Sequence, residues 1–518
     1  MNGSKDTTIS DAVQQFAAQA EAQTPAVDIP EYDVVIVGAG ISGINMAYRL
    51  QENLAKKSYT IIEARANMGG TWDLMRYPGI RSDSDLYTFS FAWAPWTQPT
   101  PIAEGGAIVK HMKESAARYG IDKHIQYRHK VKEAHWHSRL QNWTLVVEVT
   151  GEDGEVTKKE IRAKFVVLGT GYYDYDKPQE AQIPGLENFK GKVIHPQFWP
   201  EDLDYAGKSI AVVGSGATAV TLIPALAKTA GRVTMVQRSP SYIVSIPNRA
   251  ATKAWWQRIL PQWLEARITR FRWLIMGFLY RRYLSADGEK TKLFLAKVTQ
   301  AQLPKRIPYS PHFEPKYLPW AQRMCLCPDG DFFKALHSGN TDVATGVIKT
   351  VTEDKIVLES GQEVEADILI TATGLRMKYG GNCEYYVDGE HIEWGSKFMY
   401  RGWMVQDMPN LALVQGYTKA SWTLGADATA VWVIRMLKHL DKKKLSSATP
   451  RIPKPGAVKI TGLPGIMGLT STYIMSALDR LPKTSDEAPW QGRGNYLQDL
   501  YDAKFASFKN VQFTMATA

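Results

Sequence analysis

The chain has 518 residues, of which 44% are hydrophobic, and a formal net charge of +10 at pH 7. This length supports a large hydrophobic core and roughly two or three domains. The Lys and Arg residues are dispersed along the chain, which argues against a nucleic-acid-binding protein. The sequence contains no run of about 18 apolar residues, so no membrane span is predicted.

Cysteine usage argues against a metal site and for a reducing compartment. Cys325, Cys327 and Cys383 form neither a C-x-x-C motif nor a Cys/His spacing suited to zinc, so no metal is expected. Residues 1–30 lack the apolar core of a secretory signal and are predicted to be an N-terminal extension. We therefore expect a cytoplasmic protein.

The first predicted domain begins with a β-α-β unit. Tyr32–Val37 is a short apolar run typical of a buried parallel strand. A glycine-rich loop follows it, then a predicted helix over Ile44–Leu54 and a second strand over Tyr59–Ile62.

The loop carries the spacing G-x-G-x-x-G at Gly38, Gly40 and Gly43. These glycines permit a tight turn, close approach of a pyrophosphate and close packing of the helix. Glu63 ends the second strand, where a carboxylate accepts hydrogen bonds from ribose hydroxyls and repels a 2′-phosphate. This site is predicted to prefer FAD or NAD to NADP.

The rest of the first domain reads as strands. Trp143–Val149 and Glu155–Ile161 predict a hairpin around Gly151–Gly154, and Phe165–Leu168 predicts a separate buried strand. The first part of this domain is placed at residues 31–172.

A linker motif follows, with the pattern F-x-G-x-x-x-H-x-x-x-W-P. Its defined positions are Phe189, Gly191, His195, Trp199 and Pro200. His195 has the side chain of a general base, but it stands far along the chain from the first loop. We therefore favour an indirect role in which His195 holds the linker.

A second β-α-β unit begins at Ser209–Val213 and continues with a helix over Val220–Thr229 and a strand over Arg232–Val236. A further buried strand, Ile368–Thr371, resembles Phe165–Leu168 in closing at a glycine turn. The second domain is placed at residues 173–375, and residues 376–518 are expected to return to the first domain and form a C-terminal segment.

The second glycine-rich loop contains Gly214, Gly216 and Thr218. The end of its second strand carries Arg238 and Ser239 in place of an acidic residue. A guanidinium there pairs with a 2′-phosphate through charge-assisted hydrogen bonds, so the second nucleotide is predicted to be NADPH.

Residues of about 250–305 change character and predict a helical insertion in the second domain. Aromatic residues alternate there with Arg and Lys at helical spacing; they are Trp255, Trp256, Trp263, Phe271, Trp273 and Tyr280. The basic amphipathic stretch Leu264–Leu284 could contact a membrane surface peripherally, but we favour a helix that covers the active site.

These motifs, in this order, resemble type I Baeyer–Villiger monooxygenases, which are class B flavoprotein monooxygenases. The linker motif lies between the two loops, and Gly70–Asp83 fits a second pattern of that family, G-x-W-x-x-x-x-Y-P-G-x-x-x-D. The segments Pro319–Cys325, Tyr417–Leu424 and Leu478–Lys483 resemble its ethionamide-activating branch. The resemblance covers about residues 31–500.

The resemblance implies an α/β fold with two Rossmann-like domains, one for FAD and one for NADPH. It places a catalytic arginine at Arg323, with Asp83 as its carboxylate partner and as a cofactor contact. Gln322 stands where many members have Lys, which leaves more of the 2′-phosphate binding to Arg238. Further cofactor-binding residues are implied at Gly70, Thr71, Trp72, Tyr87 and Val131.

The expected reaction converts ketones and molecular oxygen to esters or lactones through a C4a-peroxyflavin, with sulfoxidation as a side activity. The alternatives are a class B N/S-monooxygenase, an uncoupled NADPH oxidase and a peripheral membrane-binding protein. The substrate pocket is expected to draw on the helical insertion, Ser421–Leu424 and the segment near Trp490. The sequence leaves the natural substrate and the oligomeric state open.

Overall fold

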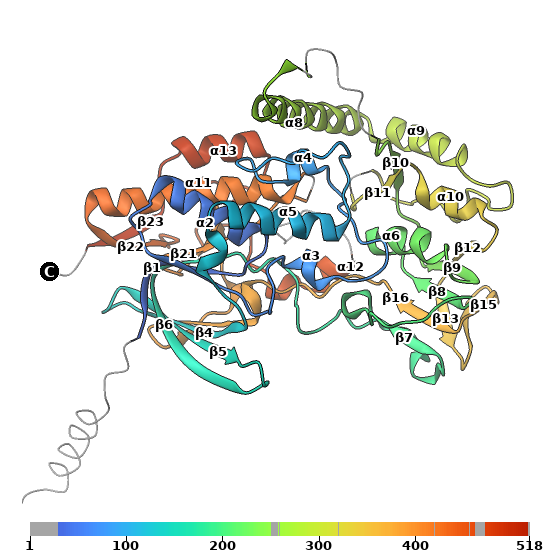
Figure 1. Ribbon diagram of the computed structural model, residues 1–518, viewed down its shortest axis with the longest axis horizontal. Coiled ribbons are helices and arrows are strands. Elements are labelled where there is room, and N and C mark those ends of the chain that lie inside the picture. The colour runs from blue at the N-terminus through green and yellow to red at the C-terminus, as the bar shows by residue number, and fades with distance from the viewer. Residues whose placement is uncertain are drawn as a thin grey trace, which may run out of the picture.

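A computed structural model describes residues 29–249, 257, 259–319, 321–418, 420–454, 456–460 and 472–515. Nearly all of the predicted N-terminal extension lies outside these residues, as do Trp255, Trp256, Trp320 and Lys419. The described chain is organised around two large sheets, which lie toward opposite ends of the molecule (Figure 1).

The first sheet is mixed, with antiparallel pairs at its centre and a run of parallel strands toward one end. Its strands in spatial order are β18 (Glu390–His391), β17 (Glu384–Val387), β4 (His129–His137), β5 (Asn142–Thr150), β6 (Val156–Leu168), β1 (Glu31–Val37), β2 (Tyr59–Ile62) and β3 (Ile125–Gln126). Next to β6, β21 (Leu411–Leu413) adds a parallel strand that continues into β20 (Met404–Val405) and β19 (Met399–Tyr400).

The two faces of this sheet bury alternate residues of β1, as a strand requires. Val34 and Ile36 pack against one layer of helices, and Val35 packs on the opposite face. That helical layer contains α2 (Ile41–Asn53), α5 (Gly105–Arg118) and α11 (Trp422–Lys443), and α13 (Tyr496–Phe505) packs against α11. Short helices α3 (Thr71–Leu74), α4 (Leu86–Phe89) and α12 (Thr472–Met475) complete this part of the chain.

The second sheet is wholly parallel. Its order is β12 (Thr341–Thr345), β9 (Arg232–Gln237), β8 (Ser209–Val213), β16 (Ile368–Thr371) and β7 (Lys192–Ile194). Helices α6 (Ala217–Leu226) and α10 (Asp331–His337) pack on one face, and the three-stranded sheet β13 (Ile348–Val351), β14 (Lys355–Leu358) and β15 (Glu363–Glu365) packs on the other. Two strand pairs remain: β10 (Ile243–Ile246) with β11 (Cys325–Pro328), and β22 (Leu445–Pro450) with β23 (Val511–Met515).

The predicted fold class is confirmed, but one strand was predicted as two. Glu155–Ile161 and Phe165–Leu168 were expected to be separate strands, but both belong to the single strand β6. The first part of β6 pairs antiparallel with β5, and its last part pairs parallel with β1. One long strand therefore serves two neighbours, which a local reading of hydrophobic runs does not reveal.

The predicted helical insertion contains α8 (Gln262–Ala286) and α9 (Gly288–Gln300). Figure 1 shows α8 lying along the outer edge of the molecule, above α4. In the part of the chain that the structure describes, no helix is long and apolar enough to cross a membrane.

Candidate active site

The first glycine-rich loop joins β1 to α2. Gly38 has a φ of +103°, which favours glycine, and a Cβ there would lie 2.8 Å from the carbonyl oxygen of Gly169. A Cβ on Gly43 would overlap the carbonyl oxygen of Gly38. Gly40 caps α2 without any side-chain hydrogen bond, so the helix N-terminus offers backbone N–H groups to an anion.

A second glycine turn stands beside this loop. A Cβ on Gly40 would lie 3.6 Å from the Cα of Gly70, so these two backbones face each other at close range. Thr170 follows Gly169, and its hydroxyl is buried without a hydrogen-bond partner. Bare backbone on two sides and an unpaired hydroxyl fit the pyrophosphate of a dinucleotide.

Glu63 lies beside the same loop. Its carboxylate is buried and accepts one hydrogen bond on each oxygen, from Ala39 N–H at 2.7 Å and from Arg65 N–H at 2.9 Å. Burial raises the pKa of Glu63, although both backbone hydrogen bonds oppose that shift. Each carboxylate oxygen keeps a free lone pair, as hydrogen bonds from ribose hydroxyls require.

The other residues implied for the first cofactor are spread more widely. Thr71 and Trp72 begin α3, where the Thr71 hydroxyl bonds the Tyr175 hydroxyl at 3.0 Å. Tyr87 donates its hydroxyl to the carbonyl of Pro99 at 2.9 Å, on the side of the molecule that faces α8. Val131 lies in the core on β4. Their binding roles stay predictions.

The second loop has the same construction. Gly214 has a φ of +137°, and a Cβ there would overlap the carbonyl oxygen of Ala372. Gly216 caps α6 without a side-chain bond. The Ser215 hydroxyl donates to the carbonyl of Ser239 at 2.8 Å, which draws the loop to the end of β9, where Arg238 is exposed. The glycine turn and an arginine therefore lie at the same end of the parallel sheet.

Asp83 and Arg323 form an ion pair although they stand 240 positions apart in the sequence. Asp83 Oδ2 lies 2.7 Å from an Nη atom of Arg323, and Asp83 raises the pKa of Arg323 above its usual value. The guanidinium therefore stays charged at any working pH.

This ion pair lines a pocket with an aromatic wall. The lining residues are Asp83, Ser84, Phe89, Tyr172, Arg323, Tyr417, Thr418, Ala420, Trp422 and Tyr473. About 40% of the Arg323 side chain remains exposed beside them. A second hollow, at the β5–β6 turn, contains none of the predicted site residues. Among the described residues of the three segments expected to build the pocket, only Ser421–Leu424 contributes, through Trp422.

Sequence reasoning singled out Tyr417, as part of the segment Tyr417–Leu424, but not the other two tyrosines of this wall, Tyr172 and Tyr473. Tyr172 follows the glycine turn that ends β6, a position at a strand end that could have signalled it. Its ring stacks on Trp422 at 4.9 Å, and its hydroxyl bonds that of Tyr173. Burial raises the pKa of Tyr473 far above neutrality, so its phenol stays neutral. Nothing in its sequence context indicates that Tyr473 belongs to the site.

The linker motif lies outside the pocket lining. Phe189 is buried and Pro200 is exposed. A Cβ on Gly191 would overlap the carbonyl oxygen of Asp367, so this position requires glycine. Trp199 packs edge-on against Tyr205.

His195 accepts a hydrogen bond from Gln197 N–H at 3.2 Å through Nδ1, and its Nε2 lies 3.3 Å from the carbonyl of Gly374. Burial lowers the pKa of His195, and these partners suit a neutral ring that donates from Nε2. His195 thus joins the linker to the turn after β16.

Two chain segments, which contain Tyr173 and Met377, lie side by side where the chain passes between the two sheets. Tyr173 pairs with Met377 in an antiparallel bridge. The buried carboxylate of Asp174 accepts from Asn382 at 2.8 Å and lies 3.5 Å from Arg376. These contacts hold the passage between the two nucleotide-binding units, next to the tyrosines of the pocket.

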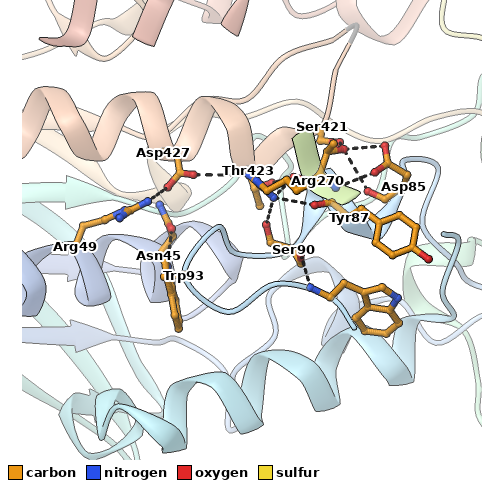
Figure 2. A network of polar contacts seen from close by, with 12 residues as sticks. Asn45, Arg49, Asp85, Tyr87, Ser90, Trp93, Arg270, Ser421, Thr423 and Asp427 are labelled. Atoms are coloured by element: carbon orange, nitrogen blue, oxygen red, sulfur yellow. Dashed lines mark hydrogen bonds and ion pairs between the residues drawn. The ribbon is translucent and has the colours of Figure 1, made fainter. Parts of the chain in front are cut away.

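Helix α8 attaches to the first unit through one buried arginine (Figure 2). Arg270 donates to the carbonyls of Tyr87, Thr88 and Ser90, each at 3.0 Å, around the C-terminal end of α4. Its guanidinium also lies 3.9 Å from the buried carboxylate of Asp427, whose other oxygen bonds Arg49 at 3.1 Å. Because α4 directly follows Asp83 and Ser84, the contacts of Arg270 hold one wall of the pocket in place. Helix α8 itself contributes no residue to the pocket lining.

We expect Arg270→Met to destabilise the protein by about 3 kcal/mol, because three buried or partly buried carbonyls lose their donor and Asp427 loses one of two cations. The measurement is the free energy of unfolding in denaturant. Arg267→Met is the control: Arg267 is exposed on the same helix, and its replacement should change stability by less than about 0.5 kcal/mol. Equal stability of the two variants would contradict the role given to Arg270.

The chain has relatives among known proteins. Residues 35–260 match the family model described as pyridine nucleotide-disulphide oxidoreductase. The FAD-containing monooxygenase EthA of Mycolicibacterium smegmatis is 44% identical over 472 residues, covering 90% of this chain and 94% of EthA. The probable FAD-binding monooxygenase AlmA of Acinetobacter baylyi is 41% identical and covers 92% of this chain and 94% of its own.

Among solved structures, an oxidised steroid monooxygenase bound to NADP superposes with a TM-score of 0.71 at 20% identity, covering 94% of this chain and all of that one. A polycyclic ketone monooxygenase from Thermothelomyces thermophila gives 0.70 at 19% identity, with 96% and 92% covered. At this identity the likeness establishes the fold. The 44% identity to EthA over most of both chains shows that this chain belongs to the family of FAD-containing monooxygenases.

Proposed function

We propose that this protein is an NADPH-dependent Baeyer–Villiger monooxygenase that inserts one atom of molecular oxygen beside a ketone carbonyl to give an ester or lactone. One observation carries the proposal: the Asp83–Arg323 ion pair sets a permanently charged guanidinium in the wall of an aromatic pocket. Thioethers would be oxidised in the same pocket as a side activity.

Residues 31–172 and 376–518 would form the FAD-binding domain. The Gly38–Gly43 loop and Gly70 would hold the pyrophosphate against the N-terminus of α2, and Glu63 would hold the adenosine ribose. When bound, FAD accepts a hydride from NADPH and activates molecular oxygen for transfer to the substrate.

Residues 173–375 would form the NADPH-binding domain. Gly214, Gly216 and Thr218 would hold the pyrophosphate at the N-terminus of α6, and Ser239 and Arg238 at the end of β9 would receive the 2′-phosphate. His195 would keep the linker in place between the two domains. The three buried cysteines, which form no disulfide, fit the reducing cytoplasm.

Arg238→Ala should raise the KM for NADPH about tenfold to a hundredfold, because charge-assisted hydrogen bonds to the 2′-phosphate are lost. The KM for NADH should stay unchanged, since NADH carries no such phosphate. The matched control is Arg232→Ala, at the opposite end of β9, where the arginine pairs with Asp342. Steady-state kinetics with both coenzymes decide, and a parallel loss with NADPH and NADH would contradict the assignment.

The pocket residues have distinct tasks in this scheme. Arg323 holds a positive charge beside the place where oxygen acquires negative charge, and Asp83 fixes the orientation of that guanidinium. Tyr172, Trp422 and Phe89 present ring surfaces that exclude water. Neutral phenols such as Tyr473 supply hydrogen-bond donors without competing negative charge.

The test is product analysis with purified protein, a panel of cyclic and linear ketones and one thioether. We expect the visible spectrum of bound flavin, an ester or lactone from at least one ketone, and less than one peroxide per NADPH consumed. Sulfoxide as the only product would instead indicate an N/S-monooxygenase. One peroxide per NADPH with every substrate would indicate an uncoupled oxidase.

A further inference from the structure

The outward face of α8 is strongly apolar although it faces solvent. Phe271 is 64% exposed, Met276 65% and Tyr283 77%. Other large apolar side chains of α8 are exposed to between 36% and 60%; they are Trp263, Trp273, Ile275, Phe278, Leu279 and Tyr280. So many large apolar side chains exposed on one helix mark an interaction site in a folded protein.

These side chains cannot turn inward, because the opposite face of α8 is already fixed. Ala266, Arg270 and Leu284 are the buried residues of that face. Figure 2 shows the Arg270 guanidinium among the polar groups of α4 and α11. Rotating the helix would remove Arg270 from three carbonyls and from Asp427, so the apolar face is held outward.

The charges of α8 are almost entirely positive. The helix contains five arginines and a single acidic residue, Glu265. Arg267, Arg272 and Arg282 are exposed together with the apolar side chains, and the Arg267 guanidinium lies over the Trp263 ring at 5.6 Å. Tryptophan and tyrosine rings interleaved with arginines suit the boundary between lipid headgroups and acyl chains.

We propose that α8 docks this face, parallel to the membrane plane, on a bilayer surface that carries anionic lipids. The helix would lie on the membrane, since no described helix can cross it. A second copy of this chain fits less well, because two-fold pairing of α8 with itself would bring arginines of like charge together. This inference goes beyond the proposed reaction and does not depend on it.

The experiment is flotation of the FAD-loaded full-length protein with vesicles of phosphatidylcholine alone or mixed with phosphatidylglycerol. The apolar variant carries Phe271→Ser, Met276→Ser and Leu279→Ser. Its matched control carries Leu497→Ser, Tyr501→Ser and Phe505→Ser, which remove an exposed apolar row from α13. The charge variant carries Arg267→Gln, Arg272→Gln and Arg282→Gln, and its control removes three exposed lysines, Lys442, Lys443 and Lys444, in the same way.

We expect the wild-type protein to float with anionic vesicles at least fivefold more than with phosphatidylcholine alone, and to lose this binding in high salt. Each α8 variant should reduce binding roughly tenfold or more, and each control less than twofold. The flavin spectrum and thermal midpoint of every variant verify folding.

Failure of the wild-type protein to float, or equal flotation of the α8 variants, would overturn the proposal. The proposal would also be overturned if the wild-type protein had no affinity for lipid but formed a dimer, and the apolar variant were a monomer.

Discussion

Replacing Arg323 with alanine should lower the rate of ester formation by about 10²–10³-fold while leaving bound FAD in place. Removing one preorganised cation or donor at a developing oxyanion has an effect of this size. Arg323 lies in the pocket wall, and neither nucleotide-binding loop depends on it for its shape. NADPH oxidation should therefore continue, with its electrons appearing as hydrogen peroxide.

The partner carboxylate should matter less. Asp83→Asn removes the charge that orients Arg323, but the guanidinium remains protonated, because an arginine keeps its proton at any working pH even without a carboxylate partner. We expect a loss of about tenfold in ester formation, in line with one charge-assisted hydrogen bond. In the wild-type protein Asp83 raises the pKa of Arg323 further, so this ion pair contributes its stabilisation at every pH below the ordinary pKa of arginine. Ester formation should accordingly show no titration of the arginine near neutral pH.

Arg451→Ala is the control for Arg323→Ala. Arg451 is an exposed arginine that also pairs with a carboxylate, that of Asp407, but it stands outside the pocket lining. Product and peroxide are measured per NADPH in both variants, with FAD content from the visible spectrum. An unchanged ester yield per NADPH in Arg323→Ala would show that this arginine is not needed for oxygen transfer to the substrate. Loss of FAD in that variant would show that Arg323 serves cofactor binding instead.

The sequence was most informative where a strand is buried and short. β2, β8 and β16 end at the predicted residues, because each is an apolar run closed by a polar or glycine residue. The helices after both loops begin at Ile41 and Ala217, three residues earlier than expected. Each helix begins inside its glycine-rich loop. Hydrophobic periodicity does not predict this start, because the loop residues match a turn motif.

The active site depended on information that local patterns do not contain. Arg323 and Asp83 were paired through family resemblance alone, since no spacing rule connects positions so distant. The Arg270 contact was not expected at all. An arginine in a basic helix suggests a solvated face, and only the tertiary structure shows that this one is buried between α4 and α11.

A single methyl group at Gly43 should prevent stable FAD binding. A Cβ at this position would overlap the backbone carbonyl of Gly38 and lie 3.3 Å from a methyl group of Ile36. The colliding atom is backbone, so either α2 or the loop must move away. Gly38 belongs to the turn that faces Gly169, and its displacement would disturb the surface on which the pyrophosphate would lie. We expect the FAD content of purified Gly43→Ala to fall about tenfold or more.

Gly106→Ala separates this steric effect from the general cost of replacing a glycine. Gly106 lies in α5, and a Cβ there would have no neighbour within 4 Å, so alanine should be neutral or stabilise by up to about 1 kcal/mol. Circular dichroism establishes that Gly43→Ala is folded, and titration with FAD measures its remaining affinity. A folded, fully yellow Gly43→Ala protein would mean that the close packing of β1 against α2 is not what shapes the FAD site. A colourless but folded protein, beside a yellow Gly106→Ala protein, would tie cofactor binding to the one contact that only glycine permits.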